Sequence, residues 1–233
     1  MPVVDDLGLL DMRAGIDFIY DNRGRMLLSN DPVASARRPA PRFTIGSASG
    51  GYVVRYGASL DDEQVRQLQD IVVALPRPGT PYFREEGLDR FRAFFGDSET
   101  FGGPAYCFPS GLTRSSQAIR LTEANRDLAR DTLPWLYEEF AEWHPCFVLV
   151  SDGKAVSACY SSRIGDRASE AGVDTLPEYR GRGYAAIVTA AWGAAVRSSG
   201  RVPIYSTGWS NLASQGVARK LGLRLFGSDA TWE

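Results

Sequence analysis

The sequence is poor in the residues that most often bind metals or form disulfides. Its 233 residues include one histidine and three widely spaced cysteines, Cys107, Cys146 and Cys159. Zinc sites and disulfide frameworks need several such residues at short, regular spacings. We therefore expect no metal site, and we interpret the cysteines as small core residues of a reduced, cytoplasmic protein.

An excess of charge and a long apolar run are also missing. Lysine and arginine number 26 against 28 aspartate and glutamate residues, a formal net charge of −2. A nucleic-acid binder usually carries a basic surplus, so we expect no nucleic-acid partner. The apolar run at residues 185–196 is interrupted by Thr189 and Gly193, and the first residues are acidic. Since a membrane span needs roughly 18 apolar residues and a signal peptide a basic start, we expect no membrane partner.

Proline and glycine clusters divide the chain. They lie at residues 37–41, 76–81 and 108–111, and such density interrupts helices and strands. We place a domain boundary at the third cluster. The sequence thus predicts an N-terminal domain at residues 1–113 and a second domain at residues 114–233.

The N-terminal part has the pattern of a small α+β domain. Residues 42–45 and 52–56 read as strands joined by a serine- and glycine-rich loop. Apolar residues then recur at helical spacing from Val65 to Leu75, behind the acidic residues 61–63. No cluster of chemically active residues indicates a role for this domain.

The second part alternates between strand and helix patterns. A short strand is followed by two helical pieces separated at Pro134, three antiparallel strands, a helix, a strand and a last helix. The predicted strands lie at residues 118–121, 146–150, 155–161, 170–175 and 203–207, and the later helices at residues 183–198 and 212–221. This order indicates an α/β fold of the α+β kind.

A glycine-rich turn between a strand and a helix carries the clearest chemistry. Residues 180–185 read Arg-Gly-Arg-Gly-Tyr-Ala. Glycine has no β-carbon to hold an anion away, and the free amides and dipole at a helix start attract it. Walker A would need a lysine after the last glycine, and the dinucleotide fingerprint a third glycine. The turn therefore predicts a pyrophosphate site, with a plain strand–helix connection as the alternative.

The same residues resemble the Arg/Gln-x-x-Gly-x-Gly/Ala signature of the GNAT superfamily of acetyl-CoA-dependent N-acetyltransferases. The preceding residues 176–179 look typical of that family, as does the segment 209–214 followed by Lys-Leu-Gly-Leu at residues 220–223. The resemblance covers roughly residues 116–233. It implies a GNAT-like mixed, mostly antiparallel sheet flanked by helices, preceded here by the smaller α+β N-terminal domain.

The resemblance also implies acetyl-CoA as co-substrate. Backbone amides of the turn would bind its pyrophosphate, and a strand edge would pair with its pantetheine arm and polarise the thioester carbonyl. Arg180 and Arg182 would pair with phosphate oxygens. The implied coenzyme-binding residues are Asp174, Thr175, Leu176, Arg180, Gly181, Arg182, Gly183, Tyr184, Ala185, Asn211 and Ser214.

The implied reaction is direct attack of a primary amine on the thioester. A base must remove a proton from the amine, which is mostly protonated at neutral pH. Glu170, on the strand that leads into the turn, is the first candidate for this catalytic base. The next candidates, on the preceding helix, are Glu138, Glu139 and Glu142.

The leaving thiolate raises a separate question. The family often places a tyrosine acid just before its Gly-hydrophobic end, but Ala218 occupies that position here. Ser214, Tyr205 or water remain as proton sources. The alanine leaves open an acyl-CoA-binding sensor or scaffold without turnover, and the glycine turn alone would also fit a nucleotide-phosphate protein of another fold. The expected acceptor is a small-molecule amine or a peptide amine, and a homodimer stays open.

Overall fold

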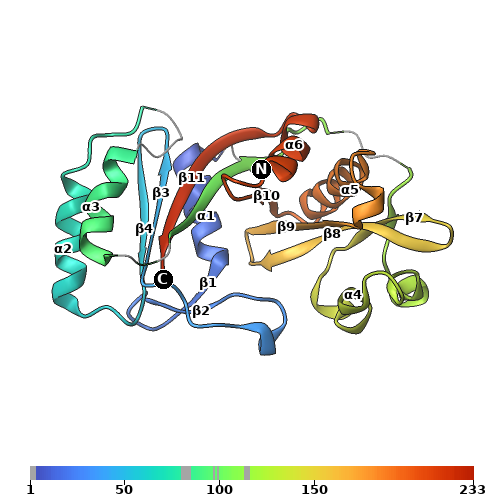
Figure 1. Cartoon of the computed structure of the whole chain (residues 1–233), viewed down its shortest axis with the longest axis horizontal. Coiled ribbons are helices and arrows are strands. Elements are labelled where there is room, and N and C mark those ends of the chain that lie inside the picture. Colours follow the sequence, from blue (N-terminus) through green and yellow to red (C-terminus); the bar gives the residue numbers. More distant parts are fainter. Residues whose placement is uncertain (1–3, 80–84, 97, 99, 113–115) are drawn as a thin grey trace.

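The computed structural model describes residues 4–79, 85–96, 98, 100–112 and 116–233. A nine-stranded sheet crosses the molecule, and a hairpin of β1 (Phe18–Tyr20) and β2 (Met26–Ser29) lies beside it (Figure 1). In spatial order the sheet contains β4 (Gly51–Tyr56), β3 (Phe43–Ala48), β11 (Arg224–Trp232), β5 (Thr100–Cys107), β10 (Val202–Ser206), β9 (Ala168–Thr175), β8 (Lys154–Ile164), β7 (Phe147–Ser151) and β6 (Ile119–Arg120). Strands β9 and β10 run parallel, and the other neighbours are antiparallel. The predicted mixed, mostly antiparallel sheet is confirmed.

Strands from both sides of the predicted domain boundary join this sheet. Strand β5 precedes the boundary in sequence, yet it lies between β11 and β10, which follow the boundary. Strands β3 and β4 extend the sheet beyond β11. The division into two domains stays a prediction, but the two segments share one hydrogen-bonded sheet.

Two helices cover opposite faces of the central strands. Helix α5 (Tyr184–Ser198) packs with Trp192 against β7, β8 and β9, and the Trp192 Nε1 donates to Ser161 Oγ at 3.1 Å. Helix α1 (Asp6–Asp17) packs on the other side, where Leu10 and Ile204 share a core cluster. The next residue of β10, Tyr205, belongs to the cluster of Trp192, as expected for alternating strand residues.

The remaining helices lie toward the ends of the sheet. Helices α2 (Asp62–Val73) and α3 (Glu85–Phe95) lie beside β3 and β4, around an aromatic core that includes Phe43 and Trp232 (Figure 1). At the other end, η2 (Glu123–Ala129), α4 (Pro134–Glu138) and η3 (Phe140–Glu142) pack over β7 and β8. Helix α6 (Leu212–Lys220) follows β10 and contacts α5. Among the described residues, no helix has the length and apolar character needed to cross a membrane.

The element predictions were mostly confirmed in the second half of the chain and incomplete in the first. The helix at residues 183–198 and the strands around it lie within about three residues of their expected ends, although the piece before Pro134 is a 3-10 helix. Elements α1, α3, β5 and β11 were not predicted from the sequence. Strand β11 has small and polar residues from Gly227 to Thr231, and β5 contains Gly102, Gly103 and Pro104, so neither segment has a strand pattern.

Candidate active site

The two parallel strands at the centre of the sheet separate after a short contact. Strands β9 and β10 pair from Ala168 with Val202 to Glu170 with Ile204. Beyond that point β9 continues along β8 to Thr175, whereas β10 continues along β5 to Ser206. The facing edges of the two strands are thereby left unpaired with each other, and an opening forms between them.

A cavity of about 750 Å³ occupies this opening. The ends of β9 and β10, the turn before α5 and parts of α5 and α6 line it. This volume is within the usual range for small-molecule sites. The predicted site residues that line it are Asp174, Thr175, Arg180, Gly181, Gly183, Tyr184, Ala185, Tyr205, Asn211 and Ser214.

The backbone of the turn is shaped for an anion. Gly181 and Gly183 have φ angles of 76° and 82°, in the left-handed region that glycine adopts most readily. Gly183 is the N-cap of α5 and supplies no side-chain acceptor to the first amides of the helix. These amides have no partner within the helix, and the positive end of the helix dipole lies at the cavity.

Two cations flank the turn. Arg180 lines the cavity, and its Nε donates to the carbonyl of Thr175 at 3.1 Å. Lys220 reaches the same place from the last turn of α6, so that a β-carbon added at Gly183 would lie 2.2 Å from its Nζ. Sequence reasoning missed Lys220, because only the tertiary contact between α5 and α6 brings it to the turn.

Two predicted coenzyme residues lie outside the lining of the cavity. The Leu176 amide donates to the carbonyl of Val156 at 3.0 Å, so it extends the pairing of β9 with β8. Arg182 donates to the carbonyl of Glu178 at 3.1 Å, and its guanidinium lies 5.1 Å from the ring centre of Tyr179. Their predicted coenzyme contacts stay predictions.

Tyr205 and Ser214 meet at the cavity wall. The two hydroxyl oxygens are 2.7 Å apart, and Ser214 is held at the first turn of α6, where its amide donates to Asn211 Oδ1 at 3.0 Å. Burial raises the pKa of Tyr205 to about 12, so its hydroxyl keeps its proton at neutral pH. Ala218, where the family often has a tyrosine, is buried in the core next to α5. The structure thus brings together two of the three predicted catalytic residues.

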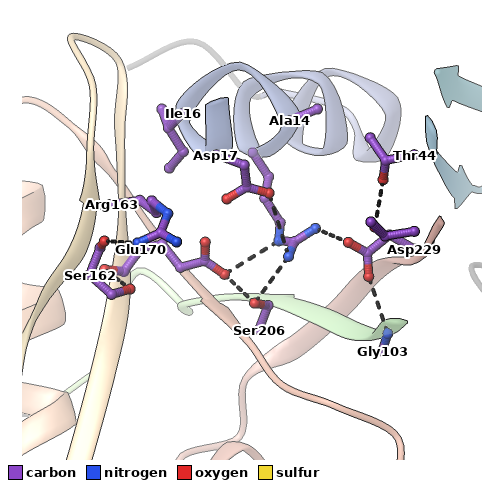
Figure 2. A network of polar contacts seen from close by, with 12 residues as sticks. Ala14, Ile16, Asp17, Thr44, Gly103, Ser162, Arg163, Glu170, Ser206 and Asp229 are labelled. Carbon is purple, nitrogen blue, oxygen red and sulfur yellow. Dashed lines mark hydrogen bonds and ion pairs between the residues drawn. The ribbon is translucent and has the colours of Figure 1, made fainter. Parts of the chain in front are cut away.

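The third, Glu170, is buried on the side of the sheet that α1 covers. Its carboxylate lies beside Ser206 (Figure 2), and Arg13 contacts the same carboxylate. Arg13 Nε lies 3.3 Å from Glu170 Oε1, and Ser206 Oγ donates to the same oxygen. Burial disfavours the charge of Glu170, but Arg13 and Ser206 outweigh it, so the pKa of Glu170 is lowered. Glu170 does not line the cavity, whereas Ser206 does, so Ser206 connects them.

The alternative base candidates also lie outside the cavity lining. Glu138 ends α4, Glu139 follows it and Glu142 ends η3. None of the three lines the cavity between β9 and β10. Within the described residues, no three histidine, cysteine or carboxylate side chains are placed to hold a metal ion.

Comparison with known proteins finds one matching family model and several similar solved structures. Residues 117–228 match the family model of the GNAT acetyltransferases. No curated protein matches the sequence. Among the solved structures that resemble the chain is a GNAT-family protein from Novosphingobium aromaticivorans, with 21% identity over 57% of this chain and 64% of that one and a TM-score of 0.47. A GCN5-related N-acetyltransferase-like protein from Streptococcus suis has 17% identity over 83% of this chain and 85% of that one, with a TM-score of 0.46. A GNAT-family acetyltransferase from Colwellia psychrerythraea has 15% identity over 78% of this chain and 76% of that one, with a TM-score of 0.47.

The separated strands β9 and β10 and the glycine turn all lie in the matched segment. The match begins just before β6 and ends within β11. The chain spans 64% of the length of the Novosphingobium protein. Through residues 117–228, this chain belongs to the GNAT superfamily of acetyltransferases.

Proposed function

We propose that the protein transfers an acetyl group from acetyl-CoA to a primary amine. The observation that supports this most directly is the cavity between β9 and β10, which combines an anion-binding turn with the Tyr205–Ser214 hydroxyl pair. The cavity, the turn and the hydroxyl pair provide a place for the diphosphate, the arm and the thioester of one extended molecule.

The residues present fit the coenzyme. The first amides of α5, with Arg180 and Lys220, would hold the pyrophosphate through charge-assisted hydrogen bonds of about 1.5–3 kcal/mol each. The unpaired edge of β9 near Asp174 and Thr175 would pair with the pantetheine arm. Asn211 uses its side-chain oxygen to cap α6, which leaves its amide nitrogen as a donor for that arm. Bound there, acetyl-CoA supplies an acetyl thioester, which exchanges its C–S bond for a C–N bond to the acceptor.

Ser206 and Glu170 would remove the proton from the amine. An alkyl amine has a pKa near 10.4, so only about one molecule in 2,500 is neutral at pH 7. Ser206 Oγ lines the cavity and donates to Glu170 Oε1. As the amine passes a proton to Ser206 Oγ, the serine passes its own proton to Glu170, and the nitrogen lone pair becomes free to attack.

Tyr205 and Ser214 would stabilise the leaving sulfur. With a pKa of about 12 against about 8.5 for a thiol, complete proton transfer from Tyr205 to the thiolate would be uphill by about 3.5 units, roughly 5 kcal/mol. Tyr205 would therefore donate a hydrogen bond and keep its proton, and water would protonate the thiolate afterwards. The tyrosine absent at position 218 is not required for this role.

Two measurements test the proposal. Calorimetry should show coenzyme A binding, and a chromogenic thiol reagent should show release of coenzyme A when acetyl-CoA is mixed with a panel of small amines and peptides. Binding with no thiol release for any amine would favour the second candidate, an acyl-CoA-binding sensor or scaffold, which the alanine at position 218 also fits. ATP or NAD binding that coenzyme A fails to displace would exclude both.

A further inference from the structure

Helix α1 places the side chain of Arg13 against the face of the sheet that this helix covers, beside the opening between β9 and β10. Arg13 Nη1 lies 2.5 Å from Asp229 Oδ2 on β11, and Nη2 lies 3.3 Å from Ser206 Oγ on β10. The same guanidinium contacts Glu170 on β9 at 3.3 Å and Asp17, one turn along α1, at 3.6 Å. Arg13 therefore joins α1 to β9, β10 and β11, and Figure 2 shows Asp17, Glu170, Ser206 and Asp229 gathered below the helix.

The contacts of Arg13 are shielded from water. The side chains of Arg13 and Glu170 are 13% and 8% exposed, and those of Asp17 and Asp229 are each 16% exposed. Charges that are this buried attract strongly, but they are costly when they lack a partner. A planar guanidinium presents five donors in a fixed plane, which suits it to hold several acceptors at once.

Asp229, which binds the Arg13 guanidinium opposite Glu170, is itself held in place. Asp229 Oδ1 accepts from the Gly103 amide at 3.1 Å, so the carboxylate that holds Arg13 is anchored to β5. Two other titratable groups face Glu170: Asp17 on α1 shares a side-chain hydrogen bond with it, and Arg163 on β8 donates to the carbonyl of Ser162 at 2.6 Å and lies 3.6 Å from Asp31. Arg13 is thus the cation that contacts Glu170 directly.

We propose that Arg13 is a positioning residue of the transfer site, and that helix α1 uses it to hold the carboxylate of Glu170 against Ser206. The inference rests on the proposed function, because it assigns a role relative to the base of that reaction. The proposal gives helix α1 a role in the reaction, although α1 precedes the matched family segment, which begins at residue 117.

Removing the guanidinium should change how Glu170 titrates. In Arg13→Gln the cation is lost, the pKa of Glu170 should rise by at least one pH unit, and the acidic limb of the rate profile should move with it. At pH 7, kcat for thiol release should fall about tenfold because Glu170 is no longer held against Ser206. The KM for acetyl-CoA should stay the same, because Arg13 contacts none of residues 180–185.

Three comparison variants separate positioning from general stability. Arg13→Lys keeps the positive charge but loses the planar, multidentate guanidinium. Its rate profile should therefore have its acidic limb at the wild-type pH, while kcat recovers only in part relative to Arg13→Gln. Arg224→Gln removes the exposed ion pair with Asp6, 2.5 Å long, which also ties α1 to β11, and it should change neither quantity. Asp229→Asn keeps the cation and removes a competing carboxylate, so the pKa of Glu170 should move lower.

Carbon NMR of the side-chain carboxyls gives a readout that needs no turnover. The Glu170 signal, assigned by its loss in Glu170→Gln, is titrated in each variant. A higher pKa of Glu170 in Arg13→Gln with recovery in Arg13→Lys supports the proposal, and identical titration in Arg13→Gln and wild type overturns it.

If Arg13→Gln does not fold, a downward shift of the Glu170 pKa in Asp229→Asn supports the proposal and no shift overturns it. If the wild type releases no thiol with any amine, the proposed function and the catalytic part of this inference both fail, while the titration still decides whether Arg13 holds Glu170.

Discussion

Strand β10 presents a different polar cluster on each of its faces. Tyr205 faces α5 and α6 and pairs with Ser214, two neutral hydroxyl groups at the cavity wall. The next residue, Ser206, joins the charged cluster of Arg13 and Glu170 below α1. Because neighbouring residues of a strand point to opposite faces, one short strand places the proposed hydrogen-bond donor to the leaving sulfur and the proposed proton relay, Ser206, on opposite sides of the sheet.

The two clusters also differ in how the chain builds them. Tyr205 and Ser214 are 9 residues apart, and one strand–helix connection brings them together. Arg13 and Asp229 are 216 residues apart, and the whole sheet is needed to align them. The neutral pair is therefore a local product of the GNAT segment, whereas the charged cluster depends on the N-terminal helix.

The charged cluster can be broken by removing its one central cation. Arg13→Met would leave Asp17, Glu170 and Asp229 buried without that partner, so we expect the free energy of unfolding to fall by about 3–5 kcal/mol. Urea unfolding at pH 7 measures the loss. Arg224→Gln, at an ion pair whose arginine is 53% exposed, should cost less than about 1 kcal/mol. Equal losses for the two variants would mean that the buried cluster adds no stability.

The cavity side can be broken without touching the charged cluster. Gly183→Ala would force a φ of 82° on alanine and displace Lys220 from the turn, so the Kd for coenzyme A should rise about tenfold, or 1.4 kcal/mol. The matched control is Gly200→Ala. Gly200 has a φ of 83° and no atom within 4 Å of an added β-carbon, and it lies at the far end of α5. It should lose similar stability in unfolding experiments and keep its Kd, and an equal change in Kd would refute a specific role for the turn.

Breaking the hydrogen bond between Tyr205 and Ser214 should have a smaller effect on stability than removing Arg13. Tyr205→Phe removes the 2.7 Å hydrogen bond to Ser214, so we expect a loss of about 1 kcal/mol in unfolding free energy. Thiol release should slow by a similar factor, about fivefold to tenfold, at every pH from 6 to 10. The ratio of variant to wild-type rate should not vary with pH in this range, because the phenol does not ionise below its pKa of about 12. A double-mutant cycle with Ser214→Ala tests the pairing, and additive losses would contradict it.

The same contrast explains what the sequence could predict. The turn at residues 180–185 depends on local chemistry, namely glycine at positive φ before a helix start, and its place between a strand and a helix was predicted correctly. The capping of α6 by Asn211 is equally local, although the sequence analysis did not predict it. Most elements from β7 to α6 also have clear apolar periodicity. Lys220, Ser206 and Arg13 have no local signal, because their partners lie on other elements.

The missed strands have a physical reason that only packing reveals. A β-carbon at Gly102 would lie 2.2 Å from the Asp229 carbonyl oxygen, and one at Gly103 would lie 1.7 Å from that of Thr207. These glycines permit the close approach of β5 to its neighbours, but in the sequence they indicate a turn. The predicted boundary at residue 113 was drawn without β5 or β11, so the sharing of one sheet across it could not be anticipated.

The smallest effect expected is a dependence on pH inside the charged cluster. Burial raises the pKa of Asp17, partly offset by Arg13, whereas Arg13 and Ser206 lower that of Glu170 against the effect of burial. The stability that Asp17 contributes is therefore full below its unfolded pKa and is lost as the pH rises through its folded value. Glu170 behaves oppositely, and its contribution is lost as the pH falls.

Asparagine at position 17 separates these two contributions. It carries a permanent amide hydrogen and no charge, so Asp17→Asn should unfold within about 0.5 kcal/mol of wild type at pH 5. At pH 8, where the aspartate of wild type is more costly to keep protonated, the variant should be the more stable by up to about 1 kcal/mol. Glu170→Gln should instead lose stability at pH 8. Urea unfolding at both pH values measures these differences. An Asp17→Asn variant that loses the same stability at pH 5 and pH 8 would contradict a raised pKa of Asp17 in the folded protein, because only a shifted pKa makes the difference depend on pH.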